Sequence, residues 1–213
     1  MAQHSTGMDV EILFPTPLFI TQMDIDHDKL RKDIIEFSSV TENAGYSNIG
    51  GYQGHFFENE EWMEWMHYLI PMKPNEPRWD RSTYAIHNWV NVNPPGSSNS
   101  RHAHISSHVY LAGVHYVQVP ENSGCIRFYD PRGPVGRAMP DGVYWEGGST
   151  AQFIQPKEGM VLFFPNYIEH DVEENKSDDT RVSIGFNIML RELDLSRIGK
   201  GNEENLEVDK KVD

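Results

Sequence analysis

Three histidines in two separate segments of the chain have the types and spacing expected of a metal site. His102 and His104 stand two positions apart, just before an expected strand, and residues at this spacing in an extended segment point to the same side. Both imidazoles could therefore bind one ion, and His108 shares their parity as a reserve ligand. His170 follows a turn, an apolar run and a proline. An antiparallel pairing of the two segments would bring His170 to the same ion, although hydrogen-bonded structural histidines are the alternative.

A second candidate site lies on the segment 181–190, whose two faces differ in polarity. Its odd positions begin with Arg181, Ser183, a glycine and Asn187, whereas its even positions are apolar. The odd face is either solvated or lines a cavity. In a cavity, Arg181 could bind a carboxylate in a bidentate pair assisted by the Ser183 hydroxyl.

Short apolar runs separated by turn clusters predict an all-β core. Upstream of it, an apolar segment at 13–22 predicts a strand, and helical spacing predicts helices at 28–37 and 58–70. The expected core strands are 84–93, 109–119, 125–129, 151–155, 160–164 and 181–190, with a shorter one at 143–146. We therefore expect one mainly β domain of the sandwich or jelly-roll type. Residues 1–83 would supply its strand and supporting helices, 84–191 its core, and 192–213 a loose acidic tail.

Composition limits the possible partners and compartment. The chain has 213 residues and a formal net charge of −14, which argues against binding to a nucleic-acid backbone. Its one cysteine, Cys125, cannot form an internal disulfide, and neither a signal peptide nor an apolar stretch of roughly 18 residues is apparent. These features favour the cytoplasm and no membrane association.

Several blocks, taken in order, resemble one enzyme family. They are His102-Ala-His104, the segment 112–117 followed by Pro120-Glu-Asn-Ser-Gly124, Phe128-Tyr-Asp-Pro-Arg132, Phe164-Pro-Asn-Tyr-Ile-Glu-His170 and Arg181-Val-Ser-Ile-Gly-Phe-Asn187. This order is similar to the 2-oxoglutarate/Fe(II)-dependent oxygenases that include uncharacterised bacterial and phage proteins. The similarity extends from about residue 11, with Phe14-Pro-Thr-Pro-Leu18, to about residue 190.

The resemblance implies a double-stranded β-helix with flanking N-terminal helices, enclosing Fe(II) and binding 2-oxoglutarate. It implies that 2-oxoglutarate decarboxylation is coupled to hydroxylation of an unidentified substrate, in the cytoplasm of a bacterium or of a phage host. His170 corresponds to the distal metal ligand, and Arg181 with Ser183 to the co-substrate site. Where the wider superfamily has His-x-Asp or His-x-Glu, this chain has His102-Ala-His104, so either His104 takes the place of the usual carboxylate or fewer protein ligands hold the ion. Asp171 is expected near the site or at the surface, but not as a ligand.

Further candidates flank the metal motif. Tyr116 stands at a position similar to that from which relatives help to bind the co-substrate, with an aromatic core role as the alternative. Trp89, Asn91 and Asn93 share one parity on the strand 84–93 and are candidates to line the substrate mouth. Arg127 is a candidate contact for a substrate anion, with an exposed, solvated role as the alternative. We expect no catalytic residues beyond the metal ligands.

Two other functions remain open from the residues alone. One is a cupin-like metalloenzyme that uses three histidines without 2-oxoglutarate. The other is a non-catalytic β-sandwich binding module whose histidines serve packing. Under the oxygenase interpretation, the substrate is a peptidyl residue or a small metabolite, and nothing in the sequence specifies the oligomeric state.

Overall fold

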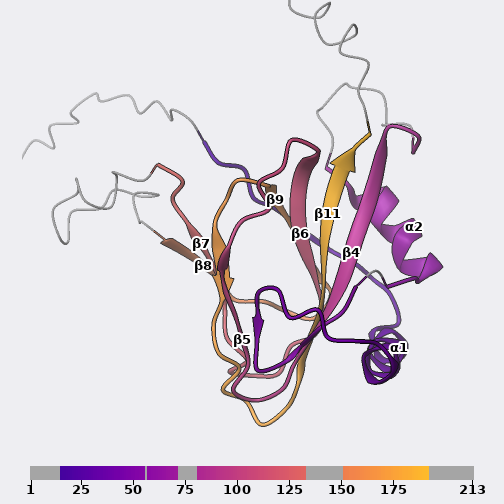
Figure 1. Ribbon diagram of the computed structural model, residues 1–213, viewed down its shortest axis with the longest axis vertical. Helices are drawn as coiled ribbons and strands as arrows, with labels where there is room; N and C mark the ends of the chain where they lie inside the picture. The colour runs from indigo at the N-terminus through magenta and orange to yellow at the C-terminus, as the bar shows by residue number, and fades with distance from the viewer. Residues whose placement is uncertain (1–14, 56, 72–80, 133–150, 192–213) are drawn as a thin grey trace, which may run out of the picture.

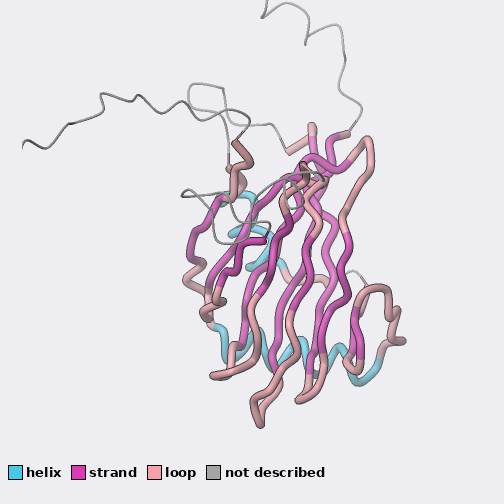
Figure 2. Tube along the Cα trace, turned by 90° about the vertical axis from the view of Figure 1, so that its left-hand side faces the viewer, coloured by secondary structure: helices cyan, strands magenta, loops and turns pink. Residues whose placement is uncertain are grey.

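Two antiparallel β-sheets pack face to face, and two helices cover the outer side of the larger sheet (Figures 1 and 2). The computed structural model describes residues 15–55, 57–71, 81–132 and 151–191. This arrangement confirms the predicted mainly β double-stranded β-helix with N-terminal helices.

The larger sheet, sheet A, has six strands in the order β1-β9-β6-β11-β4-β3. Its strands are β1 (Phe19–Gln22), β9 (Met160–Pro165), β6 (Val109–Gln118), β11 (Arg181–Leu190), β4 (Tyr84–Asn93) and β3 (Tyr52–Gln53). β11 is central because it pairs along nearly its whole length with both β4 and β6. A residue on β11 therefore has neighbours at the same level on two other strands.

The smaller sheet, sheet B, has five strands in the order β2-β5-β10-β7-β8. They are β2 (Asn48–Ile49), β5 (Ser98–His102), β10 (His170–Val172), β7 (Ile126–Tyr129) and β8 (Ala151–Ile154). Both β5 and β10 contain or border candidate metal ligands, and they are hydrogen-bonded neighbours.

Helix α1 (His27–Val40) and helix α2 (Glu60–Leu69) pack through residues four positions apart. Leu30 and Ile34 on α1, and Trp62 and Met66 on α2, are buried because this spacing places them on one helix face. They meet the even residues of β11, among them Phe186, in the larger apolar core. Each helix begins at a side-chain cap, formed by the residues Asp26 and Asn59.

A second core lies between the two sheets. Tyr116 and Phe164 of sheet A meet Ile126 and Phe128 of sheet B there. The odd residues of β11 face this same interior, because successive side chains on a strand point to opposite sides. The polar face of β11 therefore lines a cavity and is not a solvated face.

Both predicted helices and the predicted strands on described residues are present, with ends shifted by a few positions. The short strands β5 and β10 were not expected, and His102 ends β5, whereas the sequence placed it just before a strand. The expected strand at 143–146, the first part of the segment 13–22 and the tail 192–213 lie outside the described residues. The division of the domain at residue 83 stays a prediction.

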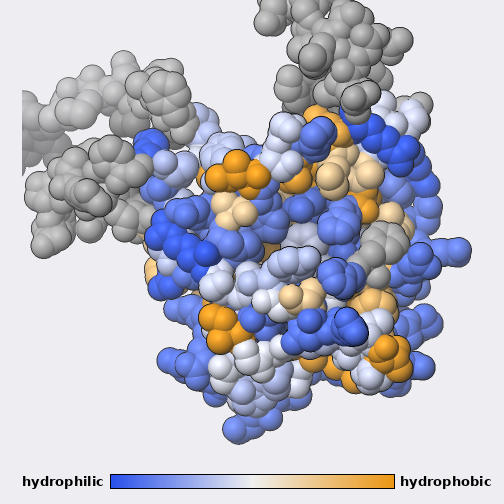
Figure 3. Space-filling model, in the orientation of Figure 1, coloured by the Kyte–Doolittle hydropathy of each residue, from blue (hydrophilic) through white to orange (hydrophobic). Residues whose placement is uncertain are grey.

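The described residues on the face shown in Figure 3 are largely hydrophilic, and the apolar ones form small separate groups. In the described ranges, no helix combines the length and apolar character needed to cross a bilayer.

Candidate metal centre and adjoining pocket

His102, His104 and His170 converge at one end of the space between the sheets. In the antiparallel pairing of β5 with β10, His102 lies directly opposite His170. His104 stands two residues beyond β5, where its backbone N–H donates to Asn166 O at 2.9 Å. The candidate ligand atoms of the three imidazoles all lie within 4.8 Å of one another. The structure thus brings together the three predicted ligands.

Hydrogen bonds orient two of these rings. His102 Nδ1 lies 2.7 Å from Ser100 O, and His170 Nδ1 lies 3.1 Å from Ile168 O. A carbonyl oxygen only accepts, so each Nδ1 carries the hydrogen and donates it. In the neutral ring, Nε2 then keeps a free lone pair, which is the usual arrangement of metal-binding histidine.

Burial favours the neutral form of the rings. It lowers the pKa of His170 to about 3 and that of His104 to about 4, and the charge of His102 acts in the same direction on both. The His170 ring packs against Phe128 and Phe164, with centroid distances of 6.0 and 4.8 Å. Burial therefore keeps His104 and His170 unprotonated near neutral pH, and neutral imidazole is the form that binds metal.

Trp89 on β4 packs directly over His104. The two rings are stacked, with centroids 5.5 Å apart and planes at 22°. The indole lies across Gly185 of β11, where an added Cβ would stand 2.5 Å from Trp89 Cε2 and Nε1. Gly185 is therefore needed to make room for the indole, and the indole in turn supports the histidine.

Arg181 closes the other end of the pocket. It is only 2% exposed, and its Nη1 donates to Ser123 O, while Nη2 is buried without a hydrogen-bond partner. Burial lowers the pKa of this guanidinium. Ser183 lies opposite both Tyr116 and Asn91 on the flanking strands, and all three line the pocket. The buried Tyr116 hydroxyl and Asn91 Oδ1 also lack partners, so the pocket offers donors and acceptors that a ligand can use.

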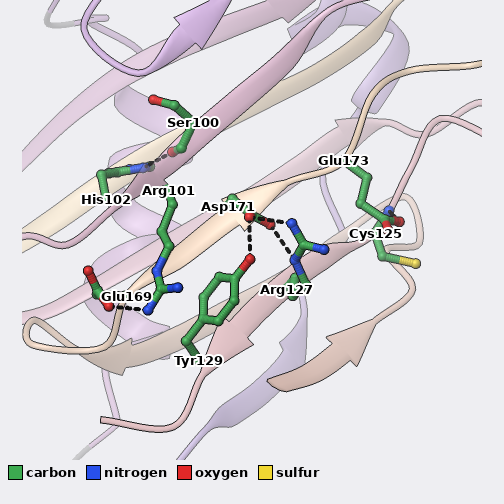
Figure 4. A network of polar contacts seen from close by, with 9 residues as sticks. All are labelled: Ser100, Arg101, His102, Cys125, Arg127, Tyr129, Glu169, Asp171 and Glu173. Carbon is green, nitrogen blue, oxygen red and sulfur yellow. Dashed lines mark hydrogen bonds and ion pairs between the residues drawn. The ribbon is translucent and has the colours of Figure 1, made fainter. Parts of the chain in front are cut away.

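The outer face of sheet B is different, because its charges are paired with one another (Figure 4). Arg127 donates to Asp171 through Nε at 3.0 Å and Nη2 at 2.6 Å, and Tyr129 Oη donates to the same carboxylate at 2.6 Å. Arg101 forms an ion pair with Glu169. These pairs join the residues next to His102 and His170, so they support the register of the two ligand strands.

Three sequence-based candidates do not join the site. Arg127 was a candidate contact for a substrate anion. Its neighbour Phe128 faces inward, so Arg127 lies on the outer face of sheet B, as the alternative had it. Asn93 was expected at the substrate mouth, but its amide is bonded to Asn48 and Asn99. His108, the reserve ligand, is exposed and lies outside the histidine group.

Trp89 and Asn91 line the pocket, and their place at a substrate mouth stays a prediction. The Asp171 carboxylate is bonded to Arg127 on the outer face of sheet B. A second, wider cavity adjoins the histidines, and several of its residues were not singled out from the sequence. They are Tyr46, His55 and His87, whereas Asn187 stands on the odd face of 181–190 that the sequence had already offered as a cavity wall. The shared parity of His87 with Trp89 was the one sequence signal for them.

A family model described as "Putative 2OG-Fe(II) oxygenase" matches residues 87–187, which include all three histidines and Arg181. Residues 87–187 therefore match the oxygenase family that the sequence blocks resemble. Fe(II) and 2-oxoglutarate are accordingly its cofactor and co-substrate. The cupin-like enzyme and the non-catalytic module, both left open by the residues alone, give way to this assignment.

Solved structures show the same fold for the oxygenase at low sequence identity. A prolyl-4-hydroxylase from Pseudomonas putida is 14% identical, with a TM-score of 0.56 over 83% of this chain and 94% of the other. HygX from Streptomyces hygroscopicus, with nickel and 2-oxoglutarate bound, is 10% identical, with a TM-score of 0.56 over 84% and 87%. The viral collagen prolyl hydroxylase of Paramecium Bursaria Chlorella virus-1, a 2-oxoglutarate complex, is 15% identical, with a TM-score of 0.50 over 82% and 96%. No curated protein matched the chain.

Proposed function

We propose that the oxygenase hydroxylates a C–H bond of an organic substrate. In the overall reaction, 2-oxoglutarate, dioxygen and the substrate give succinate, carbon dioxide and the hydroxylated product. The observation that carries this proposal is the pairing of features in one pocket: three converging imidazoles at one end, and a buried arginine with an unpaired Nη2 at the other.

His102, His104 and His170 fit the metal by their donor chemistry. Neutral imidazole nitrogens suit iron, and three protein ligands leave other coordination positions open. Bound there, Fe(II) would supply the positions at which 2-oxoglutarate and dioxygen are activated. The Nδ1–H bonds of His102 and His170 to backbone carbonyls hold the rings in the required tautomer before the metal arrives.

Arg181 is proposed to bind the C5 carboxylate of 2-oxoglutarate. A buried guanidinium without an anionic partner is costly, and within the described chain no carboxylate forms an ion pair with Arg181. A ligand carboxylate would satisfy Nη2 and could also accept from the hydroxyls of Tyr116 and Ser183. The proposed co-substrate therefore supplies the charge that this end of the pocket lacks.

The apolar residues of the pocket are proposed to keep water away from the reaction. Phe164 and Phe128 pack beside His170, and Trp89 covers His104. A dry pocket strengthens the interaction between Arg181 and the bound carboxylate, and it limits side reactions with solvent.

Titration of 2-oxoglutarate into the anaerobic Fe(II) protein tests the proposal. Arg181→Met should weaken 2-oxoglutarate binding by about 100-fold or more, because charge-assisted hydrogen bonds contribute roughly 1.5–3 kcal/mol each. Iron binding should be unchanged. The matched control is Arg127→Met, which removes the same group from the outer face of sheet B and should leave 2-oxoglutarate affinity intact. Equal affinities in wild type and Arg181→Met would refute the co-substrate assignment.

A further inference from the structure

The wider cavity lies on the opposite side of the histidines from Arg181. It has a volume of about 370 Å³, and its walls include His102, His104 and Trp89, which it shares with the inner pocket. The histidines thus lie between two cavities. Arg181, the proposed co-substrate residue, closes the inner pocket, and the wider cavity remains available to the molecule that is oxidised.

Strand β11 shows how the two spaces are ordered in depth. Its inward residues are Arg181, Ser183, Gly185 and Asn187, and alternate strand residues are about 7 Å apart. Arg181 and Ser183 line the inner pocket, Gly185 lies under Trp89 at the level of His104, and Asn187 lines the wider cavity. Asn187 of β11 lies directly opposite His87 of β4 in the strand pairing, so the two residues are neighbours on the cavity wall.

The described residues on the wall of this cavity are mostly polar or aromatic. None of the described residues that line it is Asp, Glu, Lys or Arg. Moving an ionised group from water into such a site is costly without a partner of opposite charge. The cavity should therefore select against anionic and cationic groups.

Two features indicate what the cavity favours. Asn187 Oδ1 is buried without a hydrogen-bond partner, so a donor from a ligand would satisfy it. The Trp89 indole is flanked by the His87 ring at 6.0 Å, and Tyr46, which also lines the cavity, meets His55 edge-on at 6.2 Å. These rings offer faces against which a flat group can stack.

We infer that this cavity binds the substrate of the oxygenase through an uncharged, flat group bearing an N–H or O–H donor, and that Asn187 determines this specificity. The inference rests on the proposed function, because it takes the cavity beside the histidines as the substrate site. A peptide side chain and a free small molecule can both present such a group.

Three nearly isosteric probes test the charge preference on the anaerobic protein loaded with Fe(II) and 2-oxoglutarate. Benzamide is neutral, benzoate is anionic and benzamidine is cationic, and binding is measured by ligand-observed NMR. Benzamide should bind at least about tenfold more tightly than either charged probe. Comparable binding of benzoate or benzamidine would overturn the inference.

Variants of Asn187 test the specificity assignment. Asn187→Asp places a carboxylate in the cavity, so the affinity ratio of benzamidine to benzamide should rise by at least about tenfold. Asn187→Leu should weaken benzamide without favouring benzamidine. Asn122→Asp adds the same charge beside a groove on the outer face of sheet B and should leave the ratio unchanged. An unchanged ratio in Asn187→Asp would contradict the role of Asn187.

The same samples separate this inference from the proposed function. If 2-oxoglutarate binds as proposed but the probes show no preference for the neutral group, the inference alone fails. If 2-oxoglutarate does not bind, the proposed function fails regardless of the probes. A blocked tripeptide with a central tyrosine, compared with free phenol, distinguishes the two sources: tighter binding of the peptide assigns the group to a polypeptide, and equal binding assigns it to a small molecule.

Discussion

Two groups of buried and half-buried histidines lie on opposite sides of sheet A, and their hydrogen bonds differ. Between the sheets, His102 and His170 donate through Nδ1 to carbonyls and direct free lone pairs at one point. Beneath the helices, His115 Nδ1 accepts from Trp62 Nε1 at 3.1 Å, and its Nε2 lies 3.3 Å from His27 Nε2.

In the second group, both ring nitrogens of His115 form hydrogen bonds to neighbouring side chains. Trp62 only donates, so the hydrogen of neutral His115 is on Nε2 and is donated to His27. Burial lowers the pKa of His115 to about 3, as low as that of His170. Burial and a lowered pKa are therefore shared by a packing histidine and a candidate ligand. The two kinds of histidine differ in whether a ring nitrogen keeps a free lone pair after its hydrogen bonds are made.

Removal of the His115 ring should produce the largest loss of stability. His115 is fully buried, so His115→Ala leaves a cavity and an unsatisfied Trp62 N–H, which together cost about 3 kcal/mol. Urea denaturation measures this change. Fe(II) affinity of the folded variant should remain that of wild type, and a parallel loss of iron would mean that the two groups are not independent.

The low pKa of His115 predicts a loss of stability in acid. Its ordinary pKa is 6.5, so the unfolded chain binds more protons than the folded protein between about pH 6.5 and 3. Neutral His115 makes its full contribution to the free energy of unfolding above pH 6.5. As the pH falls, this contribution is lost by on the order of 1.4 kcal/mol per pH unit.

Denaturation of metal-free protein at several pH values measures this slope. His104 and His170 contribute in the same direction, so the relevant quantity is the difference between wild type and His115→Gln. Glutamine can accept from Trp62 but does not titrate. Identical slopes would show that His115 does not carry the effect.

Crowding of Trp89 should weaken the metal site without removing a ligand. Gly185→Ala would place a methyl group against the indole that stacks on His104. We expect Fe(II) affinity to fall by about tenfold, the lower range for a residue that supports a ligand. Isothermal titration checks this, and adding Trp89→Phe should recover part of the affinity because the smaller ring leaves room. If Trp89→Phe restores no Fe(II) affinity, crowding of the indole is not the cause of the loss.

His104→Asp should have the smallest effect on iron. A carboxylate at this position gives two histidines and one carboxylate, a common set for non-haem iron, so Fe(II) affinity should stay within about tenfold of wild type. His104→Ala should bind far more weakly. Equal affinities of the two variants would exclude His104 as a ligand.

The sequence predicted the long elements and the histidine group because both depend on local pattern. The alternation along 181–190 identified Arg181 and Ser183, and the i, i+2 spacing identified His102 and His104. The strand that delivers His102 was missed because Ser98-Asn-Ser-Arg-His102 lacks the branched and aromatic residues typical of strands. Its pairing with β10 and β2 holds it in place.

The substrate side of the site was less accessible to prediction. Tyr46 and His55 reach the cavity only through the position of β2 and β3 beside β4 and β5, which no local pattern specifies. The orientation of Arg127 was available from the sequence. Its inward neighbour Phe128 is the apolar residue of the pair, so alternation places the arginine on the outside.

Anaerobic Fe(II) titration of three proteins tests the central claim most directly. Wild type and His115→Gln should each bind one iron per chain with similar affinity, because the His115 ring has no lone pair to spare for a metal. His170→Ala should remain folded and lose stoichiometric iron binding, because it removes one of three converging ligands. Full iron occupancy in His170→Ala, or loss of iron in folded His115→Gln, would contradict the assignment of the metal centre.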